Sequence, residues 1–422
     1  MSGVGAHDPY RALRVPACRR YLAGNVLGTI GFQMQGVAVG WELYERTRSP
    51  LALGLVGLVQ VLPVILFFLP VGHLVDRYDR RRVLLTAQAV LVVAAIGLAA
   101  VSAAHAPVSL IYGCLFLSGT ARAVIGPAKS ALLPEIVPLE AFQSAVAWNS
   151  GSWQTAQVIG PAAGGALLAL TRAPHQVYLA HAALAVVCVL LLLAVRSESE
   201  PRPPESASLD SLLEGARYVF RTRILIAAIT LDLFAVLFGG AVALLPVYAR
   251  DILHVGPAGL GWLLAAQSVG AVITTIVLAH LPPFRRAGPA LLRAVVLFGV
   301  ATIVFGVSRW FPLSLAALAT AGAADSVSVV IRNTLAQLRT PDALRGRVSA
   351  FNSLFIGTSN ELGYFESGAV AALVGPVASV VGGGVGTLIV VAATAAAWPE
   401  VRRLGRMEED AMTQGRKDAK SG

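Results

Sequence analysis

Charged residues are scarce in this chain of 422 residues. Asp, Glu, Lys and Arg make up 13% of it, whereas soluble domains carry about a quarter. Hydrophobic residues make up 56%. A chain of this length with so little charge is too apolar for a soluble globular protein, so we expect the lipid bilayer to be its solvent.

Sequence features that bind metals, nucleotides or haem are also lacking. The three cysteines, Cys18, Cys114 and Cys188, have none of the spacings that bind metal or haem. There is no phosphate-binding glycine loop of the ATPase type, no cluster of His and Cys, and no soluble region that would hold a catalytic centre. We therefore expect no cofactor, no metal and no enzymatic activity, and an ATP-driven pump is excluded.

Long apolar runs fill most of the chain instead. Stretches of roughly 20 apolar residues, enough to cross ~30 Å of hydrocarbon as a helix, recur with brief polar breaks. They are continuously apolar, as in VILFFLPVG, and do not alternate as barrel strands do. The sequence therefore predicts an all-α integral membrane protein with 12 transmembrane helices. The predicted spans are 22–45, 51–75, 83–104, 108–133, 142–170, 176–195, 223–249, 259–281, 288–308, 310–337, 346–374 and 377–398.

The basic residues set the expected orientation. When the loops are assigned alternately to the two sides, most of the 33 Lys and Arg residues lie on the side of both termini. The other side receives Arg46, Arg48, Arg172, Arg250 and Arg309. Basic loops face the cytoplasm in membrane proteins, so we expect both termini in the cytoplasm. This topology accounts for the net charge of +10, and no nucleic-acid partner is needed.

The longest loop divides six spans from six. It begins with a stretch rich in Pro, Glu and Ser and ends in a short amphipathic segment. The predicted parts are a cytoplasmic N-terminus at 1–20, a six-helix bundle at 21–195, a cytoplasmic linker at 196–222, a second six-helix bundle at 223–398 and a cytoplasmic tail at 399–422.

The two halves repeat each other weakly. A shift of 203 residues aligns the fourth and fifth predicted helices with the tenth and eleventh. Small apolar residues coincide by chance, so the informative pairs are the loop prolines, the basic residues and the Asn-Ser dipeptides. These pairs are Pro138 with Pro341, Lys129 with Arg332, and Asn149-Ser150 with Asn352-Ser353. Two pseudo-symmetric six-helix bundles with a binding site between them, near the middle of the membrane, are what the repeat indicates.

A charged pattern joins the second and third predicted helices. It runs GHLVDRYDRRRVLL, and its informative residues are Gly72, Asp76, Arg77, Arg80 and Arg81. The pattern resembles the motif that the major facilitator superfamily carries in this loop, and the resemblance implies that superfamily's fold. Asp79 stands where the family has a second glycine, and we expect it to bear a tight turn because Asp tolerates positive φ.

The resemblance also implies a gate. Asp76 would accept hydrogen bonds from the N-terminus of the eleventh helix, whose dipole favours an anion, and the arginines behind it would hold helix ends and lipid phosphates. This contact would close the cytoplasmic side and break when that side opens. The alternative is that the arginines only fix the topology.

A second motif bears on the direction of transport. The fifth predicted helix contains Gly160, Pro161, Gly164 and Gly165 in the sequence GPAAGG, which resembles the Gly-Pro element of the superfamily's antiporters. Proline frees a backbone carbonyl and glycines let helices approach closely. The resemblance favours antiport and therefore export, while ordinary packing of small residues is the other interpretation.

Longer segments are similar to one exporter group. The stretches RRYLAGNVLGTIGFQMQGVAVGWELYERTRSPLALGLVGLVQ, QLRTPDALRGRVSAFNS and SNELGYFESG resemble the major facilitator group that includes bacterial enterobactin exporters. The resemblance implies efflux of a siderophore or another small amphipathic molecule across the bacterial inner membrane. Within such a group the substrate is not transferable.

Ionisable residues within the spans are the candidates for proton coupling or substrate binding, because charges at membrane depth are costly. Asp232 and Asp325 lead the list, since a proton-coupling carboxylate needs burial and a nearby arginine. Arg122 and Asp325 correspond under the shift of 203, so they are expected to face each other. For each of these residues the alternative is a static salt bridge or a cap on a broken helix. The further candidates are Lys129, Arg332, Glu361 and Glu366.

Glu42 and two histidines are interpreted differently. Glu42 in WELYERT is expected at the membrane interface, with Trp41 and Tyr44 in an aromatic belt. His181 and His280 are expected to pack or to lie at the interface.

These observations predict a secondary transporter that exports a small amphipathic molecule in exchange for protons. The expected partners are the substrate, protons and the bilayer, and a monomer is expected. The alternatives are an importer or facilitator of a polar nutrient on the same fold, which Gly160-Pro161 argues against, and a membrane sensor without transport, which nothing in the sequence favours.

Overall fold

A computed structural model describes residues 8–195, 209–239, 241–282 and 284–405. Within these ranges the chain is helical and contains no strand. The pattern of contacts divides the chain into two compact units. One comprises Met1–Glu42 and Leu62–Ala207, and the other comprises Leu43–Val61 and Ser208–Gly422.

The first unit is built from long helices joined by short turns. Helix α3 packs against both α4 and α6, and buried Leu84, Leu132 and Leu192 join these helices in a common core. The elements are η1 (Arg11–Arg14), α1 (Pro16–Thr47), α2 (Pro50–Arg77), α3 (Arg80–Ala103), α4 (Val108–Ile136), α5 (Leu139–Thr171) and α6 (Pro174–Leu193).

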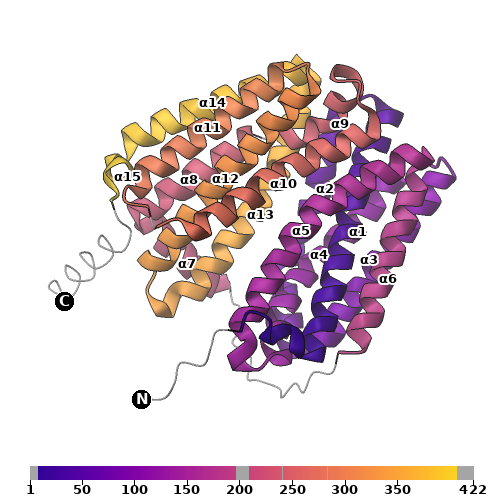
Figure 1. Cartoon of the computed structure of the whole chain (residues 1–422), viewed down its shortest axis with the longest axis horizontal. Coiled ribbons are helices and arrows are strands. Elements are labelled where there is room, and N and C mark those ends of the chain that lie inside the picture. Colours follow the sequence, from indigo (N-terminus) through magenta and orange to yellow (C-terminus); the bar gives the residue numbers. More distant parts are fainter. Residues whose placement is uncertain (1–7, 196–208, 240, 283, 406–422) are drawn as a thin grey trace. The chain divides into compact units, whose positions relative to one another are not determined.

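The second unit contains the remaining helices. Helix α10 packs along α12, and α11 lies between α12 and α14 (Figure 1). The elements are α7 (Leu209–Arg221), α8 (Arg223–Phe238), η2 (Ala241–Leu244), α9 (Leu245–Val247), η3 (Tyr248–Ile252), α10 (Gly256–His280), α11 (Ala287–Val307), α12 (Phe311–Arg339), α13 (Asp342–Val374), α14 (Pro376–Ala397) and α15 (Pro399–Arg403).

Each predicted span coincides with a helix or a run of helices. Nine helical segments in the described part of the chain are long and apolar enough to cross a membrane. The three other predicted spans fall on α1, α5 and α13, which have 32, 33 and 33 residues. These three are long enough to cross but carry more polar side chains, as expected for helices that expose a face to something other than lipid.

The seventh predicted span differs from expectation, because 223–249 is not one helix. Helix α8 ends at Phe238 and Gly239, and a short 3-10 segment, a three-residue helix and a π-helical turn follow up to Ile252. Pro246, in the first turn of α9, lacks a backbone N–H and so removes one helical hydrogen bond to the preceding turn. The span is therefore broken near its middle.

Residues 43–61 belong to the second unit although the rest of α1 and α2 does not. Glycine makes this packing possible, because α2 approaches the backbone of α13. A Cβ at Gly57 would overlap the carbonyl oxygen of Glu361, and a Cβ at Gly368 would lie 2.6 Å from the Cα of Gly54. The boundaries of the termini, the two bundles and the linker that the sequence predicts stay predictions.

Candidate functional site

The main charge cluster of the second unit joins α8 to α12. Asp232 interrupts the apolar run of α8, and its carboxylate forms an ion pair with the guanidinium of Arg332 on α12. The side chains are 5% and 7% exposed. Both residues were candidates from sequence, and the structure brings them together. Removal of one partner from a buried pair of this kind destabilises the protein, because the other charge is left unpaired in an apolar interior.

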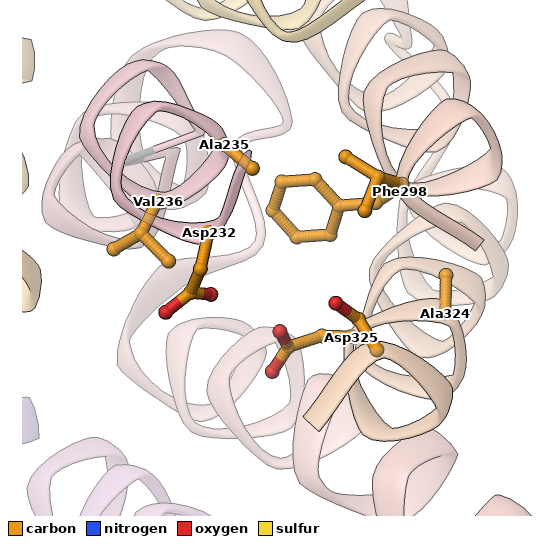
Figure 2. Close-up of a pocket in the computed structure, with 8 residues that line it drawn as sticks. Asp232, Ala235, Val236, Phe298, Ala324 and Asp325 are labelled. Atoms are coloured by element: carbon orange, nitrogen blue, oxygen red, sulfur yellow. The ribbon is translucent and has the colours of Figure 1, made fainter. Parts of the chain in front are cut away.

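A second carboxylate lies beside this pair. Asp325 precedes Arg332 by two turns on α12 and lines a small cavity together with Asp232. Figure 2 shows the two carboxyl groups approaching the cavity from α12 and α8, with the ring of Phe298 from α11 on its other side. The other lining residues are Ala235, Val236, Val295, Ala324 and Ser328.

The balance of charge at this cavity determines which groups it can bind. Two carboxylates line the cavity, and the guanidinium of Arg332 pairs with one of them, that of Asp232. When both carboxylates are ionised the cluster therefore carries a net negative charge, and one proton or one cationic group neutralises it. The Nε of Arg332 has no hydrogen-bond partner in the described part of the chain, so the guanidinium retains a donor for another acceptor. We refer to Asp232, Asp325 and Arg332 as the acid–base cluster.

The first unit contains a related arrangement. Lys129 on α4 donates a hydrogen bond to the side chain of Asn25 on α1, and Asn25 donates to Asn149 on α5 at 3.0 Å. Lys129 is the counterpart of Arg332 in the internal repeat. In both units the basic residue reaches the first membrane helix of its bundle, where it meets an amide in one unit and a carboxylate in the other.

Arg122 lies elsewhere on α4. Its guanidinium is 4.8 Å from the ring centre of Phe32 on α1, a cation–π contact, and the residue is exposed. An exposed arginine within a membrane helix favours a face that meets water rather than lipid. That Arg122 faces Asp325 stays a prediction.

The two glutamates of α13 lie outside the cavity lining. Glu366 accepts a hydrogen bond from the hydroxyl of its neighbour Ser367 at 3.3 Å, and the backbone carbonyl of Glu361 lies against Gly57. Neither contact brings these carboxylates to Arg332. Their part in coupling stays a prediction.

The loop motif contributes contacts between α3 and its neighbours. Arg80 pairs with Glu135 on α4, and Arg81 donates to the carbonyl oxygen of Leu192 at the end of α6, at 3.2 Å. The free carbonyls at a helix C-terminus attract such cations. The side chain of Asp76 lies outside the described residues, so the latch attributed to Gly72, Asp76 and Arg77 stays a prediction.

The expectation for Asp79 is wrong. Its φ is −53°, and its carboxylate accepts a hydrogen bond from the backbone N–H of Arg82 at 2.9 Å. Asp79 therefore caps the N-terminus of α3, where Asp is among the preferred residues. The family's glycine is replaced by a helix cap and not by a left-handed turn.

The antiporter-like motif forms the contact between α5 and α1. A Cβ at Gly160 would lie 2.5 Å from the Cβ of Gln33, and a Cβ at Gly164 would lie 2.7 Å from the Cα of Met34. Pro161 and Gly165 are buried in the same helix. In the second unit, a Cβ at Gly363, the counterpart of Gly160, would lie 2.8 Å from the carbonyl oxygen of Val236 on α8. The repeat therefore extends to the packing of these helices.

Polar side chains of α1 form hydrogen bonds to neighbouring helices, and one of them, Glu42, was misplaced from sequence. Gln33 bonds Gln157 on α5, and Gln35 bonds Nδ1 of His181 on α6 at 2.7 Å. Glu42, expected at the interface, is 4% exposed and accepts a hydrogen bond from the hydroxyl of Tyr178 at 2.8 Å. The available signal was the number of amide and acid side chains in one apolar span.

The end of α1 carries a further cluster that the sequence did not reveal. Tyr44, expected in an aromatic belt, is buried and donates a hydrogen bond to Asp251 in η3. Arg48 lies 3.4 Å from Asp251, and Glu45 lies 3.2 Å from Arg250. We call these five residues the α1–η3 clasp. No group of three or more His, Cys, Asp or Glu residues suited to a metal ion occurs in the described ranges.

The profile of the family described as "Transmembrane secretion effector" matches residues 7–417. Enterobactin exporter EntS of Shigella boydii serotype 18 is 28% identical over 376 residues, which cover 89% of this chain and 90% of that exporter. The same values hold for Enterobactin exporter EntS of Escherichia coli O1:K1 / APEC.

Solved transporters share the fold. A POT family transporter in complex with 5-aminolevulinic acid superposes with a TM-score of 0.72 at 10% identity, covering 91% of this chain and 96% of that one. The nucleoside transporter NupG gives 0.71 at 13% identity, with 90% and 98% covered. At this identity the likeness concerns the fold alone. Because the family profile covers nearly the whole sequence, the protein is a multi-pass membrane transporter that belongs to the transmembrane secretion effector family of the major facilitator superfamily.

Proposed function

We propose that the protein exports a small amphipathic molecule across the bacterial inner membrane in exchange for protons, with the acid–base cluster as the coupling site. The observation that carries this proposal is that two carboxylates, those of buried Asp232 and half-buried Asp325, line one cavity, while the guanidinium of Arg332 is paired with Asp232. Proton exchange requires a carboxylate that takes a proton when the cluster is empty and releases it when another group balances the charge. The cavity at this cluster has room for a carboxylate that is protonated and for one that is ionised beside a balancing group.

In the proposed mechanism of alternating access, the coupling site opens to one side of the membrane at a time, so that it exchanges protons with each side in turn. The α1–η3 clasp supports a gate at one end of the membrane, because its two ion pairs are partly exposed and are therefore easily broken. The motif at 72–82 is the proposed gate at the other end, with Asp76 as its acid. The glycine contacts of Gly160 and Gly164 with α1 form a close seam within the first bundle, which limits proton leakage in an antiporter.

The substrate class is inferred from the relatives and from the lining of the cavity. Enterobactin exporters are similar over 89% of the chain, which makes a siderophore the first candidate. The ring of Phe298 and the aliphatic side chains around Asp325 favour a ligand with both apolar and polar groups. A drug-like compound fits the same description, and the two are separated by experiment.

We infer from the basic loops that both termini lie in the cytoplasm. Most of the Lys and Arg residues lie in loops on that side. With this orientation, Arg80 and Arg81 lie on the cytoplasmic side, and Arg48 and Arg250 lie on the outer side. The proposed functional unit is a monomer.

Transport in inside-out vesicles tests the function. An imposed pH gradient, acidic inside the vesicle, should drive uptake of radiolabelled enterobactin or of ethidium in wild-type vesicles, and each molecule taken up should release protons that a lumenal pH dye records. Asp325→Asn should abolish the dependence on the gradient. The matched control is Glu140→Gln, which likewise converts a carboxylate to an amide, at an exposed position in the first turn of α5, outside the cavity lining.

The outcomes discriminate among the functions. Uptake that ignores the gradient in the wild type overturns proton antiport. Uptake driven only by a gradient of opposite sign indicates an importer that moves substrate together with protons. Absence of movement of either compound, with the protein folded, removes both as substrates and leaves the coupling site to be tested with other amphipathic compounds.

A further inference from the structure

Helix α7, which precedes the membrane helix α8, has two contrasting faces. Gly215 and Val219 are buried, and a Cβ at Gly215 would lie 2.7 Å from the carbonyl oxygen of Arg347 on α13. The hydroxyl of Tyr218 donates to the carbonyl oxygen of Arg339, at the end of α12. One face of α7 is therefore fixed against the ends of α12 and α13, as its place beside α13 in Figure 1 shows.

The opposite face is open and combines apolar with basic side chains. Leu213 is 45% exposed, and Arg217 and Arg221 are exposed as well. Phe220 lies at the edge of this face: it is 60% exposed, and its ring meets that of Phe351 on α13 edge-on, with 6.2 Å between the ring centres. These four positions are spaced i, i+4, i+7 and i+8, so they occupy about 100° of the helix circumference. We call them the α7 open face.

The charge on this face is positive. Glu214 is the one acid among residues 213–221, and it pairs with Arg347 on α13. Arg217 and Arg221 form no ion pair with another described residue. The open face therefore presents two arginines whose counter-charge comes from outside the described chain.

The position of α7 indicates what that partner is. The helix ends at Arg221, the hydroxyl of Thr222 donates to the carbonyl oxygen of Tyr218 at 2.9 Å, and α8 enters the membrane from Arg223. Because only Thr222 separates the two helices, we expect α7 to lie at the level of the lipid headgroups. A helix with apolar and aromatic side chains beside arginines is typical of those that lie in this interface.

From these observations we propose that the α7 open face binds the anionic headgroups of the surrounding bilayer, with Arg217 and Arg221 at the phosphates and Leu213 and Phe220 in the upper acyl region. The proposal goes beyond the proposed function and holds whichever molecule is carried. Because α7 is fixed to α13, lipid bound here would also hold the start of α13, at the cytoplasmic end in the proposed orientation.

Fluorescence in nanodiscs tests the proposal with the full chain. Cys18, Cys114 and Cys188 are replaced by Ala, and Phe220→Cys is labelled with a fluorophore sensitive to its surroundings. The protein is reconstituted with phosphatidylcholine alone or with added phosphatidylglycerol. A quencher on the lipid chains and iodide in the water then compete for the label. Anionic lipid sits on both faces of a nanodisc, so the result does not depend on orientation.

The expected result is a blue-shifted label that the lipid quencher reaches and iodide does not, with stronger lipid quenching when phosphatidylglycerol is present. Each arginine near an anionic surface strengthens attraction roughly fivefold. Arg217→Gln with Arg221→Gln should therefore remove the effect of phosphatidylglycerol. The matched control, Arg402→Gln with Arg403→Gln, removes the same charge from exposed positions of α15 and should preserve it.

Three results would overturn the proposal. The label is quenched by iodide in both lipids, which places the face in water. The label is shielded from both quenchers, which indicates that protein covers the face. The control pair removes the phosphatidylglycerol effect as fully as the α7 pair, which reduces the effect to net charge. Thermal unfolding of each variant verifies that α7 remains part of a folded protein.

Discussion

Arg332 on α12 and Asp232 on α8 form a buried ion pair. Asp325 on α12 lines the same cavity as Asp232. The counterpart of Arg332 in the first unit, Lys129, bonds an amide of Asn25 instead. The two halves thus keep a basic residue at the same place and differ in what it meets. Around this basic residue, the carboxylates Asp232 and Asp325 belong to the second unit, and the first unit has the amide of Asn25 instead.

The buried pair is expected to contribute to stability in an asymmetric way. Arg332→Met should destabilise the protein by about 3–5 kcal/mol, because it leaves the carboxylate of Asp232 without its partner. Arg332→Met combined with Asp232→Leu should recover most of that loss, while gradient-driven transport stays absent. Thermal unfolding in detergent measures the stability. A double variant as unstable as the single one would contradict the stranded-charge explanation.

Asp325 is expected to set the pH dependence of transport. Asp325→Asn keeps the size of the side chain but replaces the titratable carboxyl with an amide that neither takes up nor releases a proton near neutral pH, so transport should become insensitive to pH while substrate binding persists. Binding is measured by quenching of intrinsic tryptophan fluorescence, and transport is measured in vesicles across a series of pH values. If Asp325→Asn retains the wild-type pH profile, another group carries the proton.

Two glycines of α5 provide a matched comparison of packing. Gly164→Ala should cost about 1–3 kcal/mol, because its Cβ would lie 2.7 Å from the Cα of Met34. Gly151→Ala lies in the same helix with no atom within 4 Å of its Cβ, so it should be neutral or stabilise by up to about 1 kcal/mol. Melting temperatures of both variants check the order. Equal effects would show that α5 does not approach α1 closely at Gly164.

The α1–η3 clasp is expected to tolerate exchange of its charges. Glu45→Arg alone should place two cations together and impair transport, and Glu45→Arg with Arg250→Glu should restore it because the pair is remade in reverse. The effect on stability should stay below about 1 kcal/mol, since both side chains are partly exposed. Arg309→Gln, at an exposed position in another loop expected on the same side, is the control. A folded but inactive double exchange would show that the pair is not a simple gate.

The membrane fold could be predicted because its signals are local. Each apolar run is long enough to define a helix, and the family resemblance could be stated from the spacing of Asp76, Arg80 and Gly160. The break of the seventh span was not predicted, although Gly239 and Pro246 mark it. Apolar length alone does not distinguish a regular helix from a 3-10 or π-helical segment.

The residues of the candidate site could be predicted, but their contacts could not. Ionisable residues in apolar spans were identified by their cost, and Asp232, Asp325 and Arg332 are among them. Their meeting depends on which helices are neighbours and how each is rotated. The expectations for Glu42 and Tyr44 failed for the same reason, because each side chain has its partner on an element distant in sequence. The expectation for Asp79 failed locally, because its carboxylate caps the helix that begins at the next residue.

By itself the sequence determined the solvent, the helices and the list of costly side chains, since these follow from composition and from residues near one another in the chain. The tertiary structure alone decided that Arg332 meets Asp232, that Lys129 meets Asn25 and that residues 43–61 join the second unit. The physical reason is that a helix fixes the angle between its own side chains, whereas the choice of partner depends on packing between helices distant in sequence.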